Sequence, residues 1–471
     1  MRTRNFKSLC GKSVLLTALF FSTSITSFAN WSLTDDGTLT ISSDADFTLN
    51  EDGQYPWNDK KRDIYKIVME NGITKIGKRA FTRCENLESV TIPNSVTKID
   101  TSAFAGCISL TSIKLPNSIS HLGKSAFFGC ESLKSITLPQ SISQIDKSTF
   151  ALCISLTSVK LPNSISLIDS AAFSGCRSLK NIDIPNSVKT IGKAAFADCG
   201  DMVSIKLPAT ITTIDSLTFS FCSNLASIKI PNTVTNIRTK AFIGCENLKS
   251  IIIPTTVKEI GAYAFQDCRK IASVEIPNSI TMIDSFVFSG CDNLATVKLP
   301  NTITKIGANA FNGCSELKAI TIPNTVSQIG AFAFGNCSKL NSVEIPESVT
   351  SIGSYAFQMC KNLKSLKIAK TTVVNSSTFF SCTKLSNVIF ANGSCTLNAD
   401  NTQGTAYVQE IKSGSTPSVI ISVTEYDGYK FDKWSDENTN VTRELPITSD
   451  VVLTAIFKQD ETPKQEEVLS E

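Results

Sequence analysis

The feature that most constrains this chain is a cysteine that recurs at a fixed interval. The cysteines from Cys84 to Cys360 are each 23 residues apart, and Cys382 follows after 22. So regular an interval, with no insertion until the end, is typical of a solenoid in which each repeat forms one coil and packs on its neighbours. A chain of 471 residues would otherwise be expected to form two or three globular domains, and the repeat favours one stacked array instead.

Each copy contains the same signals in the same order. A phenylalanine lies three residues before the cysteine, a spacing that places both side chains on one side of a short helical turn. Two apolar residues in alternation follow, as at Ile113 and Leu115, and Pro116 then ends a strand of about three residues. The structural residues of the repeat therefore include Phe104, Cys107, Phe127, Cys130, Phe311 and Cys314.

Another position of the repeat holds glycine or aspartate, as at Gly77, Asp100 and Gly123. Arg238 occupies the same position in its own repeat and is an exception to this rule. Glycine and aspartate predict a left-handed backbone there. Stacked coils would pair their strands in parallel, and the pattern predicts 15 strand segments, the first around Ile67 and the last around Val388. The predicted fold is a repeat solenoid of the leucine-rich-repeat type, with short parallel strands, short helical turns and a sheet about 70 Å long.

The first 29 residues have the character of a signal peptide. Four basic residues precede an apolar run from Val14 to Phe21, and Ser27 and Ala29 have the spacing of a cleavage site. The run is too short to span a bilayer, and we expect no transmembrane segment. The predicted location is therefore secreted or at the cell surface after removal of residues 1–29.

The rest of the chain divides into four parts by composition. Residues 30–63 lack the repeat, and "WSLTDDGTLTIS" predicts a hairpin that serves as an N-terminal cap. Residues 64–391 form the solenoid, and 392–458 alternate as in a small, mainly β module. Residues 459–471 are polar and acidic, which favours a disordered tail.

The charge balance excludes one class of partner. The chain has a net charge of +3, and removing a segment with four basic and no acidic residues leaves 3 − 4 = −1. A chain with so little net charge is not expected to bind nucleic acid.

The repeat also resembles a known family. The block "IPNTVSQIGAFAFGNCSKL", from Ile322 to Leu340, is similar to the BspA-like, or Treponema pallidum-type, leucine-rich repeat, and the resemblance extends over roughly residues 64–390. The segment from Gly428 to Phe457 resembles the divergent internalin-B-type repeat module of bacterial surface proteins. The resemblance implies a secreted or surface-exposed protein, several relatives of which act as adhesins.

The residues themselves favour structure over chemistry. A cysteine beside a phenylalanine on a buried face acts as a small apolar residue, so buried free thiols are favoured over occasional disulfides between coils. The 23-residue interval provides no paired C-x-x-C clusters for a metal. His121 is the only histidine and no catalytic motif accompanies it. We therefore expect no enzyme, no catalytic residue, no metal and no cofactor.

Binding is the function that the repeat allows, because one residue of each strand must point out of the core. This column includes the candidate binding residues Lys114, Lys160, Lys206, Lys229 and Lys298, a basic stripe that Asp183 and Glu275 interrupt. An ordinary solvated face is the alternative. The aromatic residues Tyr429, Phe431 and Trp434 have two interpretations, the core of the small module or a stacking surface for sugars.

The sequence thus predicts an exported binding scaffold, an adhesin of a bacterium that contacts protein or glycan ligands on host or neighbouring cell surfaces. The alternative is a structural envelope or secreted protein without a dedicated host ligand. In the first case the contacts would be shallow and multiple, spread over a rigid scaffold.

Overall fold

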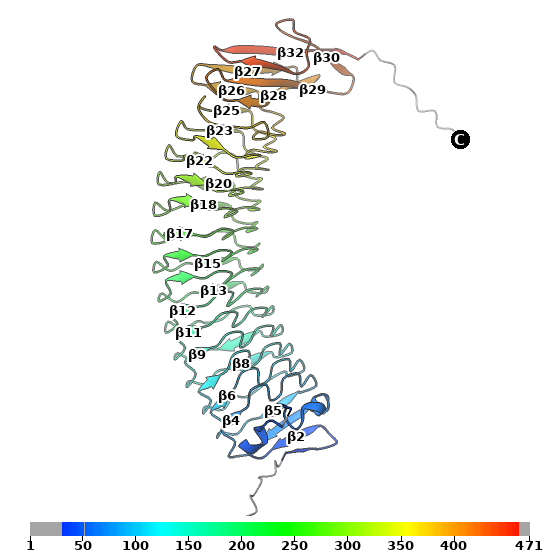
Figure 1. Cartoon of the computed structure of the whole chain (residues 1–471), viewed down its shortest axis with the longest axis vertical. Coiled ribbons are helices and arrows are strands. Elements are labelled where there is room, and N and C mark those ends of the chain that lie inside the picture. Colours follow the sequence, from blue (N-terminus) through cyan, green and yellow to red (C-terminus); the bar gives the residue numbers. More distant parts are fainter. Residues whose placement is uncertain (1–30, 51, 461–471) are drawn as a thin grey trace, which may run out of the picture.

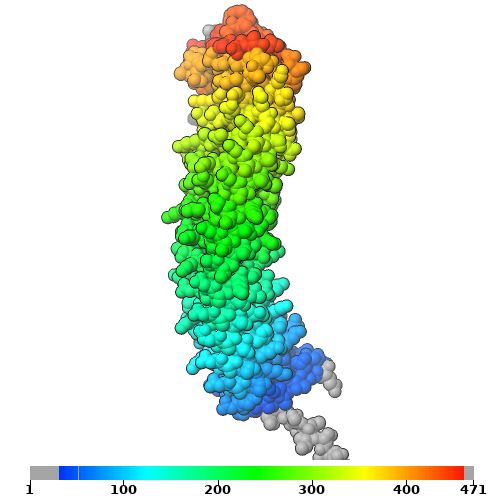
Figure 2. Space-filling model, turned by 90° about the vertical axis from the view of Figure 1, so that its left-hand side faces the viewer, coloured from blue at the N-terminus to red at the C-terminus, as the bar shows by residue number. Residues whose placement is uncertain are grey.

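The chain forms a bowed rod of stacked coils with a cap at each end (Figure 1). The computed structural model describes residues 31–50 and 52–460. The predicted signal peptide and the predicted tail beyond residue 460 lie outside the described residues. The space-filling view shows that the coils leave regular ridges across the rod (Figure 2).

The predicted parallel strands form a first ladder along the rod. Neighbouring strands pair in register, so that Ile205 faces Ile228 and Lys206 faces Lys229. Eleven of the 15 predicted segments are strands: β3 (Lys66–Met69), β5 (Ser89–Thr91), β8 (Ser135–Thr137), β10 (Ser158–Lys160), β13 (Ser204–Lys206), β15 (Ser227–Lys229), β18 (Ser273–Glu275), β20 (Thr296–Lys298), β23 (Ser342–Glu344), β25 (Ser365–Lys367) and β26 (Asn387–Phe390). Three of the other four form only isolated bridges, through Ser112, Asp183 and Ala319.

A second ladder of parallel strands was not predicted. Its strands are only two residues long, a polar or apolar residue followed by a buried Ile or Leu, and so short a segment has no visible period in the sequence. Its members are β4 (Lys75–Ile76), β6 (Lys98–Ile99), β7 (His121–Leu122), β9 (Gln144–Ile145), β11 (Leu167–Ile168), β12 (Thr190–Ile191), β14 (Thr213–Ile214), β16 (Asn236–Ile237), β17 (Glu259–Ile260), β19 (Met282–Ile283), β21 (Lys305–Ile306), β22 (Gln328–Ile329) and β24 (Ser351–Ile352). These residues form a sheet only because they pair with the equivalent residues of the neighbouring coils.

The segments expected as short helical turns are series of tight turns. The amide of Cys107 donates to the carbonyl of Phe104 at 3.3 Å, but Ser102 and Gly106 have left-handed φ angles of 56° and 76°. Two left-handed residues within five positions prevent a helix from continuing. Among the described residues, the helices are the 3-10 segments η1 (Asp44–Phe47) and η2 (Asn58–Asp63) of the cap, and neither is long or apolar enough to cross a membrane.

The prediction of a left-handed backbone at the glycine and aspartate position is wrong, because the positive φ angle falls two residues later, as at Ser102. Glycine is favoured there by close approach: a Cβ on Gly123 would lie 2.5 Å from the amide nitrogen of Thr101. Aspartate instead accepts a hydrogen bond from the next amide, as Asp100 does from Thr101 at 2.7 Å. The exception, Arg238, forms an ion pair with Asp215 of the preceding coil, at 4.0 Å.

The core of the rod is a continuous stack of aromatic rings. The repeat phenylalanines, from Phe81 to Phe379, are buried, and neighbouring ring centroids are 5.2–5.9 Å apart. The cysteines from Cys84 to Cys395 are all buried, free thiols. The repeat residues Phe104, Cys107, Phe127, Cys130, Phe311 and Cys314 are each 0% exposed.

The N-terminal cap closes the exposed end of this stack. β1 (Ser32–Leu33) and β2 (Thr38–Ile41) form the predicted hairpin, and β2 pairs in parallel with β3. Trp57 continues the ring stack at 5.7 Å from Phe81, and its indole Nε1 donates to the carbonyl of Ala80 at 2.8 Å. The cap therefore provides both a strand and a ring for the first coil.

The C-terminal module extends the first ladder. β26 pairs with β27 (Gly393–Ala399), which pairs with β32 (Val451–Gln459), and β30 (Tyr429–Trp434) forms the edge. A second sheet contains β28 (Gly404–Lys412), β29 (Ser418–Glu425) and β31 (Arg443–Pro446). Trp434 is 0% exposed and Phe431 9%, so the structure favours the core interpretation of these rings over sugar stacking.

Candidate functional site

The outer side of the first ladder is the candidate binding surface, here called the strand face. It consists of three outward positions in each coil, those of Thr111, Ser112 and Lys114, which are all exposed. The apolar residue between them, Ile113, is buried. Because the coils stack in register, each outward position becomes a column of side chains that runs along the rod.

The five predicted lysines all lie exposed on the strand face, but they are not equivalent. Lys206 and Lys229 lie side by side on β13 and β15. Lys298, in contrast, forms an ion pair with Glu275, with its Nζ 2.5 Å from a carboxylate oxygen. Lys298 is therefore committed to a neighbour, and its role in binding, like that of the other four, stays a prediction.

The column that contains these lysines changes character along the rod. Asp183 interrupts the basic residues and bridges to Lys206 through the backbone. Ile252 follows Lys229 and is 82% exposed, which is high for a large apolar side chain. Beyond it, Lys367 and Glu344 repeat the ion pair of Lys298 and Glu275, at 2.5 Å. In this column, the lysines without an ion pair thus lie in the N-terminal half.

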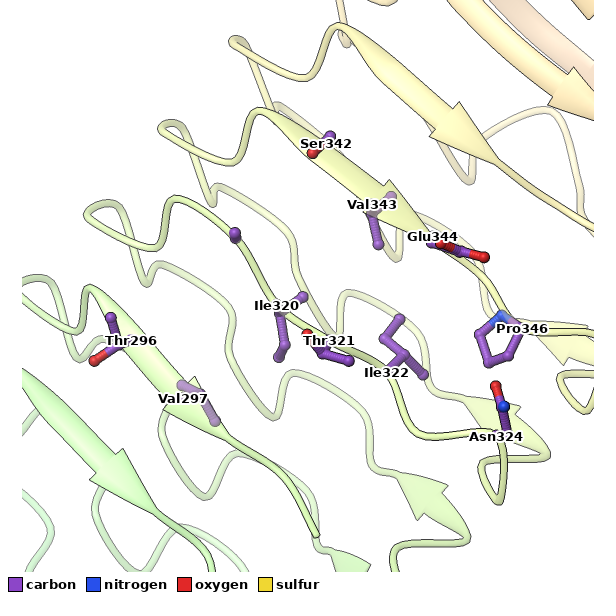
Figure 3. A pocket seen from close by; sticks show the side chains of 11 residues that line it. Thr296, Val297, Ile320, Thr321, Ile322, Asn324, Ser342, Val343, Glu344 and Pro346 are labelled. Carbon is purple, nitrogen blue, oxygen red and sulfur yellow. The ribbon is translucent and has the colours of Figure 1, made fainter. Parts of the chain in front are cut away.

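The strand face has open hollows between its coils. One of about 550 Å³ lies across three coils between β20 and β23, and is lined by Thr296, Thr321, Ser342 and Glu344 among others (Figure 3). Another, of about 530 Å³, has Lys114 and Lys160 in its lining. Among residues 31–50 and 52–460, no group of His, Cys, Asp and Glu side chains could hold a metal ion. These hollows offer contacts for a ligand that lies along the surface.

His121 lies in β7 of the second ladder, where its neighbour in register is Lys98. The structure therefore separates the single histidine from the strand face.

One further feature, two pairs of half-buried aromatic rings, was not predicted from the sequence. Tyr263 and Phe286 stack at 4.6 Å on the turn side of their coils, and Phe332 and Tyr355 stack at 5.0 Å. All four have left-handed φ angles, between 56° and 62°. The signal was available, since the four residues share one position of the 23-residue repeat, two after the glycine or aspartate.

These features define a leucine-rich-repeat solenoid with an open face. The chain belongs to the BspA-type leucine-rich repeat family, because the model for the BspA type leucine rich repeat region (6 copies) matches residues 58–170, 143–272, 218–330 and 304–422. The divergent InlB B-repeat domain matches residues 395–461. Both predicted resemblances are confirmed.

Solved bacterial structures are similar to this chain. A leucine-rich repeat protein from Eubacterium ventriosum has 26% identity and a TM-score of 0.51, over 70% of this chain and 92% of that one. One from Bacteroides ovatus has 25% identity and a TM-score of 0.48, over 77% and 98%. A leucine-rich cell surface protein from Faecalibacterium prausnitzii has 24% identity and a TM-score of 0.44, over 77% and 92%. No curated protein matches the chain.

Family membership indicates a protein-binding scaffold, of a class that is typically without enzymatic activity.

Proposed function

We propose that this protein is an exported bacterial adhesin, whose strand face binds protein or glycan ligands on host or neighbouring cell surfaces. The observation that carries the proposal is the strand face itself: an exposed, in-register array of side chains on a rod with a continuous packed core. Such a surface binds through many shallow contacts, whose affinities combine when the ligand engages several at once.

Export is part of the proposal and is supported by the sequence of residues 1–29, with its basic start and apolar run. The proposed location is secreted or at the cell surface. The proposed division of the remaining chain is a cap at 30–63, a solenoid at 64–391, a small module at 392–458 and a tail at 459–471. The proposal involves no catalytic step and no cofactor.

Binding of the purified protein to an array of extracellular-matrix proteins and to whole host cells tests the adhesin role. We expect saturable binding to at least one surface, and loss of that binding when Lys114, Lys160, Lys206, Lys229 and Lys298 are all changed to serine. Binding that survives the change would place the contact elsewhere on the rod. Absence of saturable binding to every matrix protein and cell type would favour a structural envelope role instead.

A further inference from the structure

A second set of lysines completes the basic part of the strand face. Seven successive coils, those of Cys107 to Cys245, each carry one outward lysine, at the first or the third outward position. We call this set the lysine zigzag, and its members are Lys114, Lys134, Lys160, Lys180, Lys206, Lys229 and Lys249, all exposed. None of the seven forms an ion pair with another residue of 31–50 or 52–460.

The backbone holds the two columns of the zigzag in line. The amide of Lys134 donates to the carbonyl of Thr111 at 3.1 Å, and that of Thr157 donates to the carbonyl of Lys134 at 2.9 Å, so the first outward positions stack directly. Coils about 4.8 Å apart make the zigzag about 29 Å long, and three residues of extended chain separate its two columns by about 10 Å. The result is a narrow basic track parallel to the rod.

Few carboxylates lie near the lysines of the track. Among the outward positions of its seven coils, Asp183 is the single carboxylate. The C-terminal coils differ, because Glu275 neutralises Lys298 and Glu344 neutralises Lys367. The seven coils of the zigzag thus carry seven outward lysines against one carboxylate. The five coils from Cys268 to Cys360 carry four, Lys298, Lys318, Lys364 and Lys367, against Glu275 and Glu344. Positive charge is therefore concentrated along the zigzag, although the whole chain is almost neutral.

A column of hydroxyls runs between the two columns of lysines. It contains Ser112, Ser135, Ser158, Ser204, Ser227 and Ser250, which are exposed. No hydrogen bond joins the hydroxyls of these serines to another side chain or carbonyl within the described part of the chain. Elsewhere in the coil, serines bond to the preceding coil, as Ser118 does to the carbonyl of Val96 at 2.7 Å and Ser164 to that of Ile142 at 2.6 Å. The strand-face hydroxyls are left to solvent or a ligand.

Aromatic side chains are absent from the outward positions of these seven coils. Proteins that bind single-stranded nucleic acid stack its bases on aromatic rings, and the track offers none. Sixteen of its 21 outward positions carry an ammonium group or a hydroxyl, and the other five are Asn181, Asp183, Val203, Ala226 and Ile252. This combination suits a linear, strongly hydrated polymer with repeated anionic groups and many hydroxyls.

We propose that the lysine zigzag binds a linear sulfated polysaccharide that lies parallel to the rod. Its sulfates contact the lysine ammonium groups on both sides, and its sugar hydroxyls and ring oxygens contact the serine column. Each exposed ion pair is weak, but a chain that spans seven coils engages many together and releases counterions as it binds. The proposal rests on the proposed function, and names the ligand class for that same face.

Binding of a fluorescently labelled heparin oligosaccharide to the full-length purified protein, measured by polarisation, tests the proposal. The test variant is Lys160→Ser, Lys206→Ser and Lys229→Ser together. The matched control is Lys124→Ser, Lys147→Ser and Lys193→Ser, which removes the same charge from exposed positions that follow the second ladder. We expect at least tenfold weaker binding for the test variant and a change below twofold for the control, with circular dichroism showing that both fold.

The salt dependence provides a second readout. The slope of log K against log salt should fall by about two to three in the test variant, because three contacts that release counterions are lost. Equal losses of affinity in the test and control variants would overturn the proposal, since the attraction would then be non-specific. Equally tight binding of oligo(dT) or polyglutamate would also overturn it, because the track would then not favour a sulfated glycan.

The proposal and the adhesin role can fail separately. If the protein binds matrix proteins or cells but not heparin, the adhesin role stands and the polysaccharide assignment falls. If it binds heparin through the zigzag but binds no matrix protein or cell, the assignment stands and the adhesin role falls.

Discussion

The thiol of Cys107 donates a hydrogen bond to the main-chain carbonyl of Phe81 in the preceding coil, with 3.2 Å between sulfur and oxygen. The same bond recurs for every repeat cysteine from Cys107 to Cys382, at 3.1–3.3 Å. The cysteine thus fills the core and also gives a second donor to a buried carbonyl, since the carbonyl of Phe81 accepts from the amide of Cys84 as well, at 3.1 Å. Its regular recurrence therefore follows from packing and hydrogen bonding.

Replacing a central cysteine should destabilise the solenoid. Cys222→Ala removes the bond from its thiol to the carbonyl of Phe196, at 3.1 Å, and leaves a small cavity. The carbonyl of Phe196 keeps its bond from the amide of Cys199, at 3.2 Å, so the change removes one hydrogen bond and some buried volume. Each of these contributes about 0.5–1.5 kcal/mol, and we expect a loss of about 1–3 kcal/mol in the free energy of unfolding, measured with urea at pH 7. Ser227→Ala, on the exposed strand face, is the control and should change it by less than about 0.5 kcal/mol. Equal effects of the two changes would contradict the role assigned to the thiol.

Alkaline pH should weaken the fold through the same thiols. Burial raises the pKa of Cys222 to about 12, whereas an unfolded thiol titrates near about 8.5. The folded state retains the proton that the unfolded state loses, so the stabilisation is complete below pH 8.5 and is lost as the pH rises toward 12. One thiol should contribute a loss of about 2 kcal/mol between pH 8.5 and 10.

The variant without this thiol isolates its contribution from that of other titrating groups. The difference in unfolding free energy between the parent and Cys222→Ala should shrink by about 2 kcal/mol when urea titrations are repeated at pH 10. A difference that stays constant between pH 8 and pH 10 would show that the pKa of this thiol is not raised by folding.

Substitution of any phenylalanine in the ring stack should lower the free energy of unfolding. Phe219 is 0% exposed, and its ring centroid lies 5.9 Å from that of Phe196 and 5.4 Å from that of Phe242. Phe219→Ala should lower the free energy of unfolding by about 3–5 kcal/mol, because it opens a cavity in the core. Phe221 is only two residues away but 55% exposed, and Phe221→Ala should cost far less. Similar urea midpoints for the two variants would contradict a continuous buried stack.

The stability of the N-terminal cap should depend on the hydrogen bond that the indole nitrogen of Trp57 donates. Trp57→Phe retains a ring against Phe81 but removes the donor to the carbonyl of Ala80. We expect a loss of about 1–3 kcal/mol in the free energy of unfolding. Hydrogen exchange should increase first in the coils next to the cap, since a solenoid coil is stabilised only by its neighbours. Uniform exchange along the whole rod would argue against a local capping role.

The two ladders of parallel strands show which parts of the fold can be predicted from the sequence. The first was predicted, because alternation before Pro116 and its equivalents is a local signal of a strand. The second was missed, since a pair such as Lys98 and Ile99 becomes a strand only through Lys75, Ile76, His121 and Leu122 in the adjacent coils. The same limit applies to the candidate binding site. The strand pattern predicts that the five lysines point outward, but it does not show that Lys298 forms an ion pair with Glu275.

The sequence by itself determined the solenoid, its period and the buried identity of the phenylalanine and cysteine columns, because a repeat of constant length repeats its burial pattern in every coil. Only the tertiary structure decided which backbone positions are left-handed, where glycine is required, and which lysines remain free. These properties depend on distances between neighbouring coils, such as the approach of Gly123 to Thr101, and residues 22 positions apart in the chain carry no local signal of that contact.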